Sequence, residues 1–196
     1  MILSSIKYSL KFFIFFTILL GIIYPLFIYL SGQVFYQDKA DGSLYIKKGK
    51  VIGSYLLGQK FTSDIYFWPR PSSIDYNPYP SSGSNLSMTS DSLLKLFEQR
   101  KILFIKNNML SAFSQIPSDM LFASASGVDP DISKESALLQ AKRVIIARKF
   151  NKLQSEQLFD LINSLSRQPQ FGIFGSETVN VLNLNIKLDE MSEQNE

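Results

Sequence analysis

A long, uncharged and mostly apolar run near the N-terminus constrains this chain more than any other feature. No residue from Phe12 to Gln37 carries a charge, and its most apolar part, Phe12–Leu30, is 19 residues long. As an α-helix this part spans about 28 Å, close to the roughly 30 Å hydrocarbon core of a bilayer. Backbone amides inside that core must be bonded within the segment, so the run predicts a membrane-spanning helix.

The rest of the chain is polar and mixed in composition. All 17 acidic residues and all but two of the 20 basic residues follow the apolar run. We therefore divide the chain into a short cytoplasmic N-terminus (1–11), a single transmembrane helix (12–36) and one extramembrane domain (37–196). The domain is long enough to bury a core, and its mixture of helix-like and strand-like segments predicts an α+β fold.

The charges that flank the apolar run favour one orientation. Lys7 and Lys11 precede it, whereas Asp38, Lys39 and Asp41 follow it. Because positively charged flanks tend to stay in the cytoplasm, we expect a cytoplasmic N-terminus and a domain on the outer side. A cleaved signal peptide is disfavoured, because the run is too long for a typical one and no small-x-small cleavage site follows it.

The residue types that are missing exclude several kinds of chemistry. The chain has no cysteine and no histidine. Disulfides, thiolate catalysis, Ser-His-Asp triads and nearly all zinc sites are therefore excluded. The basic residues are scattered, which argues against nucleic-acid binding. The sequence also lacks the phosphate-binding G-x-x-x-x-G-K-[ST] loop, a strand-linked G-x-G-x-x-G loop and the G-x-S-x-G nucleophile elbow.

Short apolar runs predict a β-hairpin at the start of the domain. Residues 44–46 and 51–55 are separated by a charged, glycine-containing turn. The aromatic segment 61–68 fits a third strand. Residues 69–90 are rich in Pro, Ser and Asn and show no regular period, so they predict a long loop, and that length favours a functional role.

Three segments with helical spacing of apolar residues predict helices. The first covers 90–107, the second begins at Ser133, and the third carries Leu158, Leu161, Ile162 and Leu165. Residues 116–133 look irregular. The alternation over 179–188 predicts a final half-buried strand with a bulge at Val181-Leu182, and residues 189–196 are expected to fray.

Polar residues in the second predicted helix are candidates for binding. Gln140 and Arg143 lie on adjacent turns, where an amide and a guanidinium could grip a polar ligand or a partner loop. An ordinary boundary position for Gln140 is the alternative.

Charged residues in the predicted loops allow two interpretations each. Asp129 and Asp131 could offer oxygen ligands to a hard cation, or they could orient turns around Pro130. Arg70, between two prolines, could bind a carboxylate or a carbonyl cluster, or clamp the long loop within the domain.

Small or helix-bending residues recur within the predicted anchor. Thr17, Gly21, Pro25 and Gly32 lie at near-helical spacing. Such a face lets another membrane helix approach closely, although Gly and Pro are common in membrane helices in any case.

Many short motifs are spread over nearly the whole chain in a characteristic order and spacing. They are Gly21-Ile22-Ile23-Tyr24-Pro25, Gly42-Ser43-Leu44, Val51-Ile52-Gly53-Ser54, Leu57-Gly58-Gln59, Arg70-Pro71-Ser72, Gly83-Ser84-Asn85-Leu86, Pro117-Ser118-Asp119-Met120, the run from Ser124 to Ser133, Gln140 with Arg143-Val144, Gly172-Ile173-Phe174-Gly175 and Val179–Asn185. In their order and spacing they resemble the C subunit of the Kdp-type potassium-transporting ATPase.

The resemblance implies a non-catalytic accessory subunit of a high-affinity, ATP-driven potassium uptake pump in the bacterial inner membrane. Its implied partners are a channel-like subunit, a P-type ATPase subunit and a small single-helix subunit. The family is described as a catalytic chaperone that stabilises the complex and raises the ATP affinity of the ATPase subunit. ATP is therefore the implied shared cofactor, with no metal of the chain's own, and the Asp-Lys-Thr-Gly-Thr phosphorylation motif is absent.

The resemblance also implies site residues. The nucleotide-binding set is Ser126, Gly127, Gln140 and Arg143. The expected interface with the other subunits consists of Thr17, Gly21, Tyr24, Pro25, Arg70, Pro71, Ser72, Gly83, Ser84, Asn85, Asp129, Pro130 and Ser133. The family commonly has Gly where Ala125 stands and His where Asp131 stands, so a role of that His does not carry over.

An outer domain cannot touch cytoplasmic ATP, so any effect on ATP affinity would have to be a coupling through the complex. Two rival functions also fit the residues. One is a membrane-anchored envelope enzyme, which would need a Ser activated by Lys or Asp. The other is a generic envelope binding module.

Overall fold

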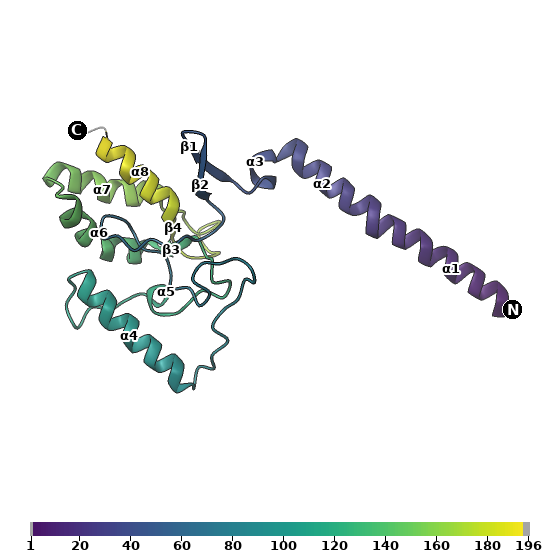
Figure 1. Cartoon of the computed structure of the whole chain (residues 1–196), viewed down its shortest axis with the longest axis horizontal. Coiled ribbons are helices and arrows are strands. Elements are labelled where there is room, and N and C mark those ends of the chain that lie inside the picture. Colours follow the sequence, from purple (N-terminus) through teal and green to yellow (C-terminus); the bar gives the residue numbers. More distant parts are fainter. Residues whose placement is uncertain (1, 194–196) are drawn as a thin grey trace. The chain divides into compact units, whose positions relative to one another are not determined.

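The computed structural model describes residues 2–193, with side chains from Ser5 onward. The chain forms two compact units, residues 1–44 and residues 45–196. The first unit is a long helix and the second is a mixed helix and strand domain (Figure 1). The predicted fold class, one apolar N-terminal helix followed by a mixed domain, is confirmed.

The N-terminal unit is helical from Ile2 to Phe35. It consists of α1 (Ile2–Ile18), the π-helical turn η1 (Leu19–Ile23) and α2 (Tyr24–Phe35), followed by the short α3 (Gln37–Ala40). The stretch Ser5–Phe35 is long and apolar enough to cross a membrane, with a mean hydropathy of 2.4. The helix begins well before residue 12, so Lys7 and Lys11 lie on its first turns. The boundaries 12 and 36 of the bilayer segment stay a prediction.

Pro25 explains the π-helical turn. Its nitrogen has no hydrogen to donate, and its ring crowds the carbonyl of Gly21 one turn earlier. The helix widens at this point, and the amide of Tyr24 donates to the carbonyl of Leu19, five residues back. The sequence pair Gly21 and Pro25 therefore marks a built-in irregularity in the middle of the anchor.

The predicted hairpin is confirmed. Strands β1 (Leu44–Lys47) and β2 (Lys50–Ser54) form a two-stranded sheet. The two turn residues, Lys48 and Gly49, have φ angles of 51° and 74°. Positive φ at both positions matches the right-handed twist of the flanking strands.

The remaining elements of the domain are mainly helical. They are α4 (Asp91–Asn107), α5 (Ser118–Leu121), β3 (Asp131–Ser133), α6 (Lys134–Arg148), α7 (Lys152–Leu165), β4 (Thr178–Asn180) and α8 (Val181–Glu193). Strands β3 and β4 pair antiparallel, with Ile132 opposite Val179. The three predicted helices are thus present as α4, α6 and α7. The stretch 116–133 is less irregular than expected, because it contains α5 and β3.

The prediction of a strand over 179–188 is wrong beyond Asn180. Strand β4 ends there and α8 begins, because the Asn180 side chain accepts a hydrogen bond from the amide of Asn183 at 3.0 Å and caps the helix. Val181, Leu184 and Leu188 lie on one helical face and are buried. The apolar residues between them are buried as well. Apolar and polar residues therefore alternate along this helix much as they would along a half-buried strand. Residues 189–193 continue α8 rather than fray, and 194–196 lie outside the described residues.

The core lies between β3, β4 and the three C-terminal helices. Helix α7 packs on both α6 and α8, and β4 contacts all three (Figure 1). The apolar stripe of α7 fills the centre through Leu158 and Ile162, both fully buried. The other central core residues are Ile132, Ala137, Ala141, Val144, Val179, Val181, Leu184 and Leu188.

Candidate functional site

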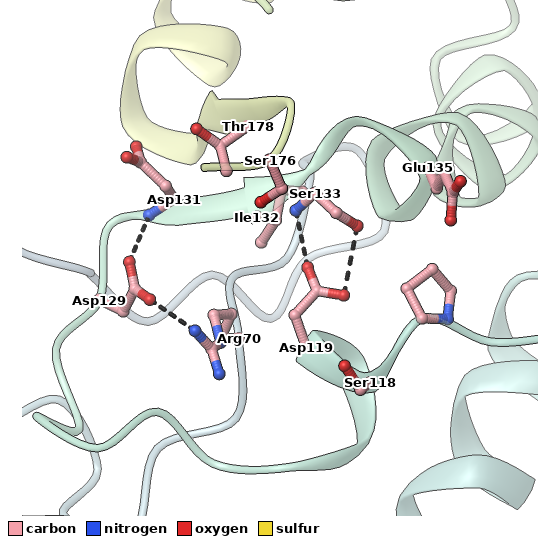
Figure 2. Close-up of a pocket in the computed structure, with 11 residues that line it drawn as sticks. Arg70, Ser118, Asp119, Asp129, Asp131, Ile132, Ser133, Glu135, Ser176 and Thr178 are labelled. Carbon is pink, nitrogen blue, oxygen red and sulfur yellow. Dashed lines mark hydrogen bonds and ion pairs between the residues drawn. The ribbon is translucent and has the colours of Figure 1, made fainter. Parts of the chain in front are cut away.

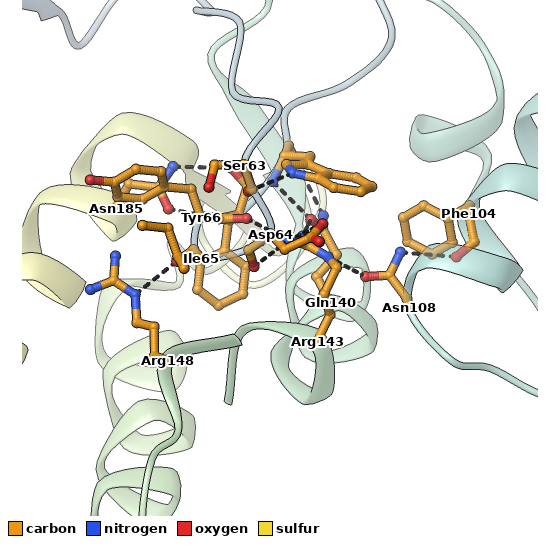
Figure 3. A network of polar contacts seen from close by, with 12 residues as sticks. Ser63, Asp64, Ile65, Tyr66, Phe104, Asn108, Gln140, Arg143, Arg148 and Asn185 are labelled. Carbon is orange, nitrogen blue, oxygen red and sulfur yellow. Dashed lines mark hydrogen bonds and ion pairs between the residues drawn. The ribbon is translucent and has the colours of Figure 1, made fainter. Parts of the chain in front are cut away.

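The segment 64–68 is held almost entirely by side chains of the neighbouring helices. The aromatic segment 61–68, which includes it, was expected to be a third strand, but it belongs to no sheet, and that prediction is wrong. Its backbone runs between α6 and α8 and bonds to polar side chains of both (Figure 3). We call this arrangement of segment 64–68 with Gln140, Arg143, Arg148 and Asn185 the backbone clamp.

Two amide side chains form the centre of the backbone clamp. Asn185 of α8 accepts from the Phe67 amide at 2.8 Å and donates to the Phe67 carbonyl at 3.0 Å. Gln140 of α6 does the same for Trp68, at 2.8 and 3.1 Å. Each side-chain amide thus replaces the peptide group that a neighbouring strand would supply. The fully buried ring of Phe67 is fixed between the helices as a result.

Arg143 extends the backbone clamp. Its Nη1 donates to the carbonyls of Asp64 and Tyr66, at 2.6 and 2.9 Å, and its Nη2 donates to Gln140 Oε1 at 2.9 Å. Its Nε donates to Asn108 at the end of α4, at 3.0 Å. The guanidinium also lies 3.8 Å from the centre of the Trp68 ring, a cation–π contact.

The Arg143 cation is buried without a buried carboxylate beside it. Its side chain is 2% exposed, and the nearest acid, Asp64, is 68% exposed and 4.0 Å away. Burial lowers the pKa of Arg143 to about 10, which still leaves the group charged at neutral pH. Carbonyl oxygens and the aromatic face therefore compensate the charge.

Arg148 closes the other end of the backbone clamp. Its Nε donates to the Ile65 carbonyl at 2.8 Å, and its Nη2 pairs with Asp189 of α8 at 2.6 Å. Asp189 also accepts from the Tyr66 hydroxyl at 3.0 Å. Residues 64–68 are thereby bonded at every position, from α6 on one side and α8 on the other.

The predicted nucleotide-binding residues do not gather at one place. Gln140 is 0% exposed, and both atoms of its amide are bonded within the backbone clamp. Arg143 is similarly enclosed. Ser126 and Gly127 lie instead on the loop before β3, where Ser126 accepts from the amide of Val128 at 3.2 Å. Direct contact between Gln140 and a nucleotide would require segment 64–68 to move. The nucleotide role stays a prediction.

The long loop 69–90 packs on the loop that carries Ser126. The amide of Ser124 donates to the carbonyl of Pro71 at 3.1 Å, and the Ser81 hydroxyl donates to the carbonyl of Ser126 at 2.8 Å. Gly127 has a φ of 72°, and a Cβ there would overlap Ile74 and lie 2.7 Å from the Ser82 carbonyl. Glycine is therefore required on both conformational and steric grounds.

Arg70 acts as a clamp within the domain, one of the two interpretations open from the sequence. Its Nη1 pairs with Asp129 Oδ2 at 2.7 Å, while Asp129 Oδ1 accepts from the amide of Asp131 at 3.1 Å (Figure 2). The carbonyl of Arg70 accepts from the Tyr76 hydroxyl at 2.7 Å. Burial raises the pKa of Tyr76 to about 12, so the hydroxyl stays protonated and keeps this bond. Asp129 thus orients the turn at Pro130, as the simpler interpretation expected.

Asp119 anchors the start of α6. Its carboxylate accepts from the amide and hydroxyl of Ser133, at 2.7 and 3.2 Å (Figure 2). It also accepts from the Ser136 hydroxyl at 2.8 Å. Ser133 in turn caps α6 by accepting from the amide of Ser136 at 3.1 Å, which confirms its predicted N-cap role.

A cavity of about 590 Å³ lies between these two carboxylates. Most of the residues that line it are polar, and four of them are acidic. It is formed by Arg70, Pro117, Ser118, Asp119, Asp129, Asp131, Ile132, Ser133, Glu135, Ser176 and Thr178. Among residues 2–193, no group of three or more acidic side chains is arranged to hold a metal ion.

The residues expected at an interface fall into two sets. On the anchor, Tyr24 is 57% exposed and Gly21 has no atom within 4 Å of its Cβ position. Thr17 is bonded along the helix to the Phe13 carbonyl at 2.7 Å. In the domain, Ser72 accepts from the amides of Ile74 and Tyr76. Pro71 and Gly83 lie at the loop contact already described, where a Cβ at Gly83 would be 3.0 Å from the Ala125 carbonyl. The Pro130 carbonyl accepts from the amide of Val181 at 3.0 Å, and Ser84 and Asn85 follow Gly83 in the long loop. A partner contact for either set stays a prediction.

Comparison with known proteins identifies the family. The sequence model of the family described as "K+-transporting ATPase, c chain" matches residues 6–190, which include both the anchor and the domain. This chain belongs to the KdpC family. The KdpC subunit of a potassium-transporting ATPase from Leptospira interrogans is 39% identical over 95% of this chain and 94% of its own length. A KdpC subunit from Mycobacterium bovis is 43% identical over 90% and 93%, and one from Bacteroides fragilis is 38% identical over 97% of both chains.

Several residues that build the KdpC domain were not singled out as candidates from the sequence. Asn185 was interpreted as the polar side of a strand, although its position three residues before Leu188 would also place it on a helix face. Trp68 was considered only as part of the aromatic segment 61–68, and Asp119 only as part of a family motif. Their roles come from contacts between residues that are far apart in the sequence. Phe67 and Asn185, for example, are 118 positions apart.

Replacement of Gln140 tests the backbone clamp. We expect Gln140→Ala to lower the free energy of unfolding by about 3 kcal/mol, because the Trp68 amide and carbonyl and one Arg143 N–H lose a buried partner. Chemical denaturation of the full chain in detergent measures the change. Gln157→Ala, at an exposed position of α7, is the matched control and should change the value by less than about 0.5 kcal/mol. Equal effects of the two variants would contradict a structural role of Gln140.

Replacement of Gly127 tests the packing of the two loops. Gly127 and Gly172 have φ angles of 72° and 73°, but only Gly127 is crowded by other atoms. Both Gly→Ala variants meet the strain of positive φ, roughly 1–2 kcal/mol. We expect Gly127→Ala to cost about 1–3 kcal/mol more, because its Cβ overlaps Ile74. Thermal unfolding of both variants measures the difference, and similar melting temperatures would count against the close packing.

Proposed function

We propose that this chain is a non-catalytic accessory subunit of a high-affinity, ATP-driven potassium uptake pump in a bacterial inner membrane. The carrying observation is the family match over residues 6–190, which spans the membrane anchor and the whole folded domain. The chain also covers nearly the full length of KdpC subunits that are 38–43% identical to it. Its proposed partners are the channel-like, P-type ATPase and small single-helix subunits of the same pump.

The proposed role is to stabilise the complex rather than to carry out a chemical step. The sequence lacks the Asp-Lys-Thr-Gly-Thr phosphorylation motif and any histidine or cysteine. The two polar side chains singled out as binding candidates, Gln140 and Arg143, bond to the backbone of segment 64–68. A domain held together by such internal hydrogen bonds is suited to present fixed surfaces to partners.

A catalytic-chaperone effect on ATP affinity would act at a distance in this proposal. With the domain outside the membrane, as the flanking charges favour, cytoplasmic ATP is out of its reach. The enclosed amide of Gln140 supports the same view, since it has no free donor or acceptor to offer. The subunit would then raise ATP affinity by stabilising the conformation of the complex that binds ATP more tightly.

The side of the membrane on which the domain lies decides between coupling and direct contact. We expect protease added to intact spheroplasts to digest the domain, followed through a C-terminal tag, because Lys7 and Lys11 hold the N-terminus in the cytoplasm. A cytoplasmic marker protein that stays intact is the control. Protection of the tag until the membrane is permeabilised would reverse the orientation and make direct nucleotide contact the mechanism to test.

Deletion of the chain tests its place in the pump. In a strain without other high-affinity potassium uptake, we expect deletion to abolish growth at limiting potassium, and the wild-type gene to restore it. We expect Gln140→Ala to reduce growth only as far as it reduces the amount of folded chain in membranes, with the KM for ATP of the remaining complex unchanged. Gln157→Ala is the control. Unchanged growth after deletion would refute the pump role, and a raised KM at normal protein level would support direct nucleotide contact.

A further inference from the structure

An apolar turn between α7 and β4 is exposed to solvent. Phe171, Ile173 and Phe174 are 92%, 77% and 66% exposed, and only Gly172 lies between them. We call residues 171–174 the apolar tip. No residue from 168 to 176 carries a charge. Large apolar side chains scattered singly over a surface need no explanation, but three of them at one turn do.

The backbone of the apolar tip is bonded within the turn itself. The amides of Gln170 and Phe174 each donate to the carbonyl of the other residue, at 2.8 and 3.0 Å. The amides of Gly172 and Ile173 donate to the carbonyls of Pro169 and Gln170, at 3.0 and 3.1 Å. A turn with three of its four amides already bonded, those of Gly172, Ile173 and Phe174, can leave water at a lower cost than an open loop.

Phe113, another exposed aromatic residue, differs from the apolar tip in its surroundings. Phe113 is 95% exposed in the turn after α4, but it lies between Ala112 and Ser114, and its amide bonds to the Ser111 hydroxyl at 3.4 Å. That turn offers one apolar side chain among small and polar ones. The apolar tip therefore differs in its chemistry, not merely in its exposure.

The domain that carries the apolar tip cannot leave the bilayer surface. The anchor helix ends at Phe35 and the first strand begins at Leu44. The eight intervening residues reach at most about 28 Å when fully extended. A domain of this size is about 40 Å across. The short tether thus keeps the domain close to the membrane, and an exposed apolar turn meets the lipid surface whenever the domain turns that side toward it.

We propose that the apolar tip inserts into the lipid interface and forms a second, peripheral attachment of the domain to the membrane. Two aromatic rings and an isoleucine gain by leaving water for the boundary of the acyl chains. Protein interfaces combine apolar anchors with hydrogen bonds at their rim, whereas the apolar tip offers no polar side chain. Since residues 168–176 are uncharged, the attachment is expected to need no anionic lipid. The inference depends on the anchor alone and holds independently of the pump role.

A fluorescent label at the apolar tip tests this attachment. The chain has no cysteine, so Ile173→Cys gives a unique labelling site in the full chain. With an environment-sensitive fluorophore, in phosphatidylcholine nanodiscs that hold one chain each, we expect blue-shifted emission and quenching by spin-labelled lipid. Phe113→Cys, at the other exposed turn, is the matched control, and its quenching should be severalfold weaker.

Further variants distinguish contact of the apolar tip with lipid from contact with protein. In the Ile173→Cys chain, Phe171→Ser with Phe174→Ser should reduce the quenching, while the melting temperature stays near that of the parent because these side chains lie outside the core. Addition of phosphatidylglycerol should leave the signal unchanged. A label at Ile173→Cys that is as exposed to water as the one at Phe113→Cys would overturn the proposal. Shielding that appears only when other membrane proteins or a second chain are added would also overturn it, in favour of a protein contact.

Discussion

Hydrogen bonding of buried backbone is the constraint on which the rest of the domain depends. Segment 64–68 runs between α6 and α8 without a neighbouring strand and leads from the exposed Asp64 to the fully buried Phe67. Its buried amides and carbonyls cannot stay unpaired there. Gln140 and Asn185 supply the missing peptide groups from two different helices. The positions of α6 and α8, the burial of Phe67 and the course of the long loop that follows all depend on these contacts.

Much of the architecture could be predicted, because it is local. The anchor follows from an uncharged run of sufficient length, and the hairpin follows from two apolar runs around Lys48 and Gly49. Helix α7 was evident from Leu158, Leu161, Ile162 and Leu165 at helical spacing. The N-cap at Ser133 was also correct. In each case the residues that decide the structure lie within one or two turns of each other.

The wrong predictions, and the residues that the sequence did not single out, involve contacts between distant parts of the chain. Segment 61–68 has strand composition, but side chains of α6 and α8 occupy the place of its partner strand. The run 179–188 alternates like a strand because α8 is buried on more than one side. The candidate site shows the same limit: Gln140 and Arg143 were singled out as binding candidates, whereas their bonds to residues 64–68 and the cavity beside Asp119 depend on long-range packing. Spacing alone does not reveal such contacts.

The use of α8 as one half of the backbone clamp has a consequence for the order in which the domain forms. Phe67 is synthesised early, but its partner Asn185 follows 118 residues later, and Asp189 comes later still. Until the last turns of α8 have left the ribosome, segment 64–68 can bond only to its α6 partners. Folding of this domain is therefore completed only once α8 is available, and a chain truncated before Asn185 would leave the amide and carbonyl of Phe67 without these partners.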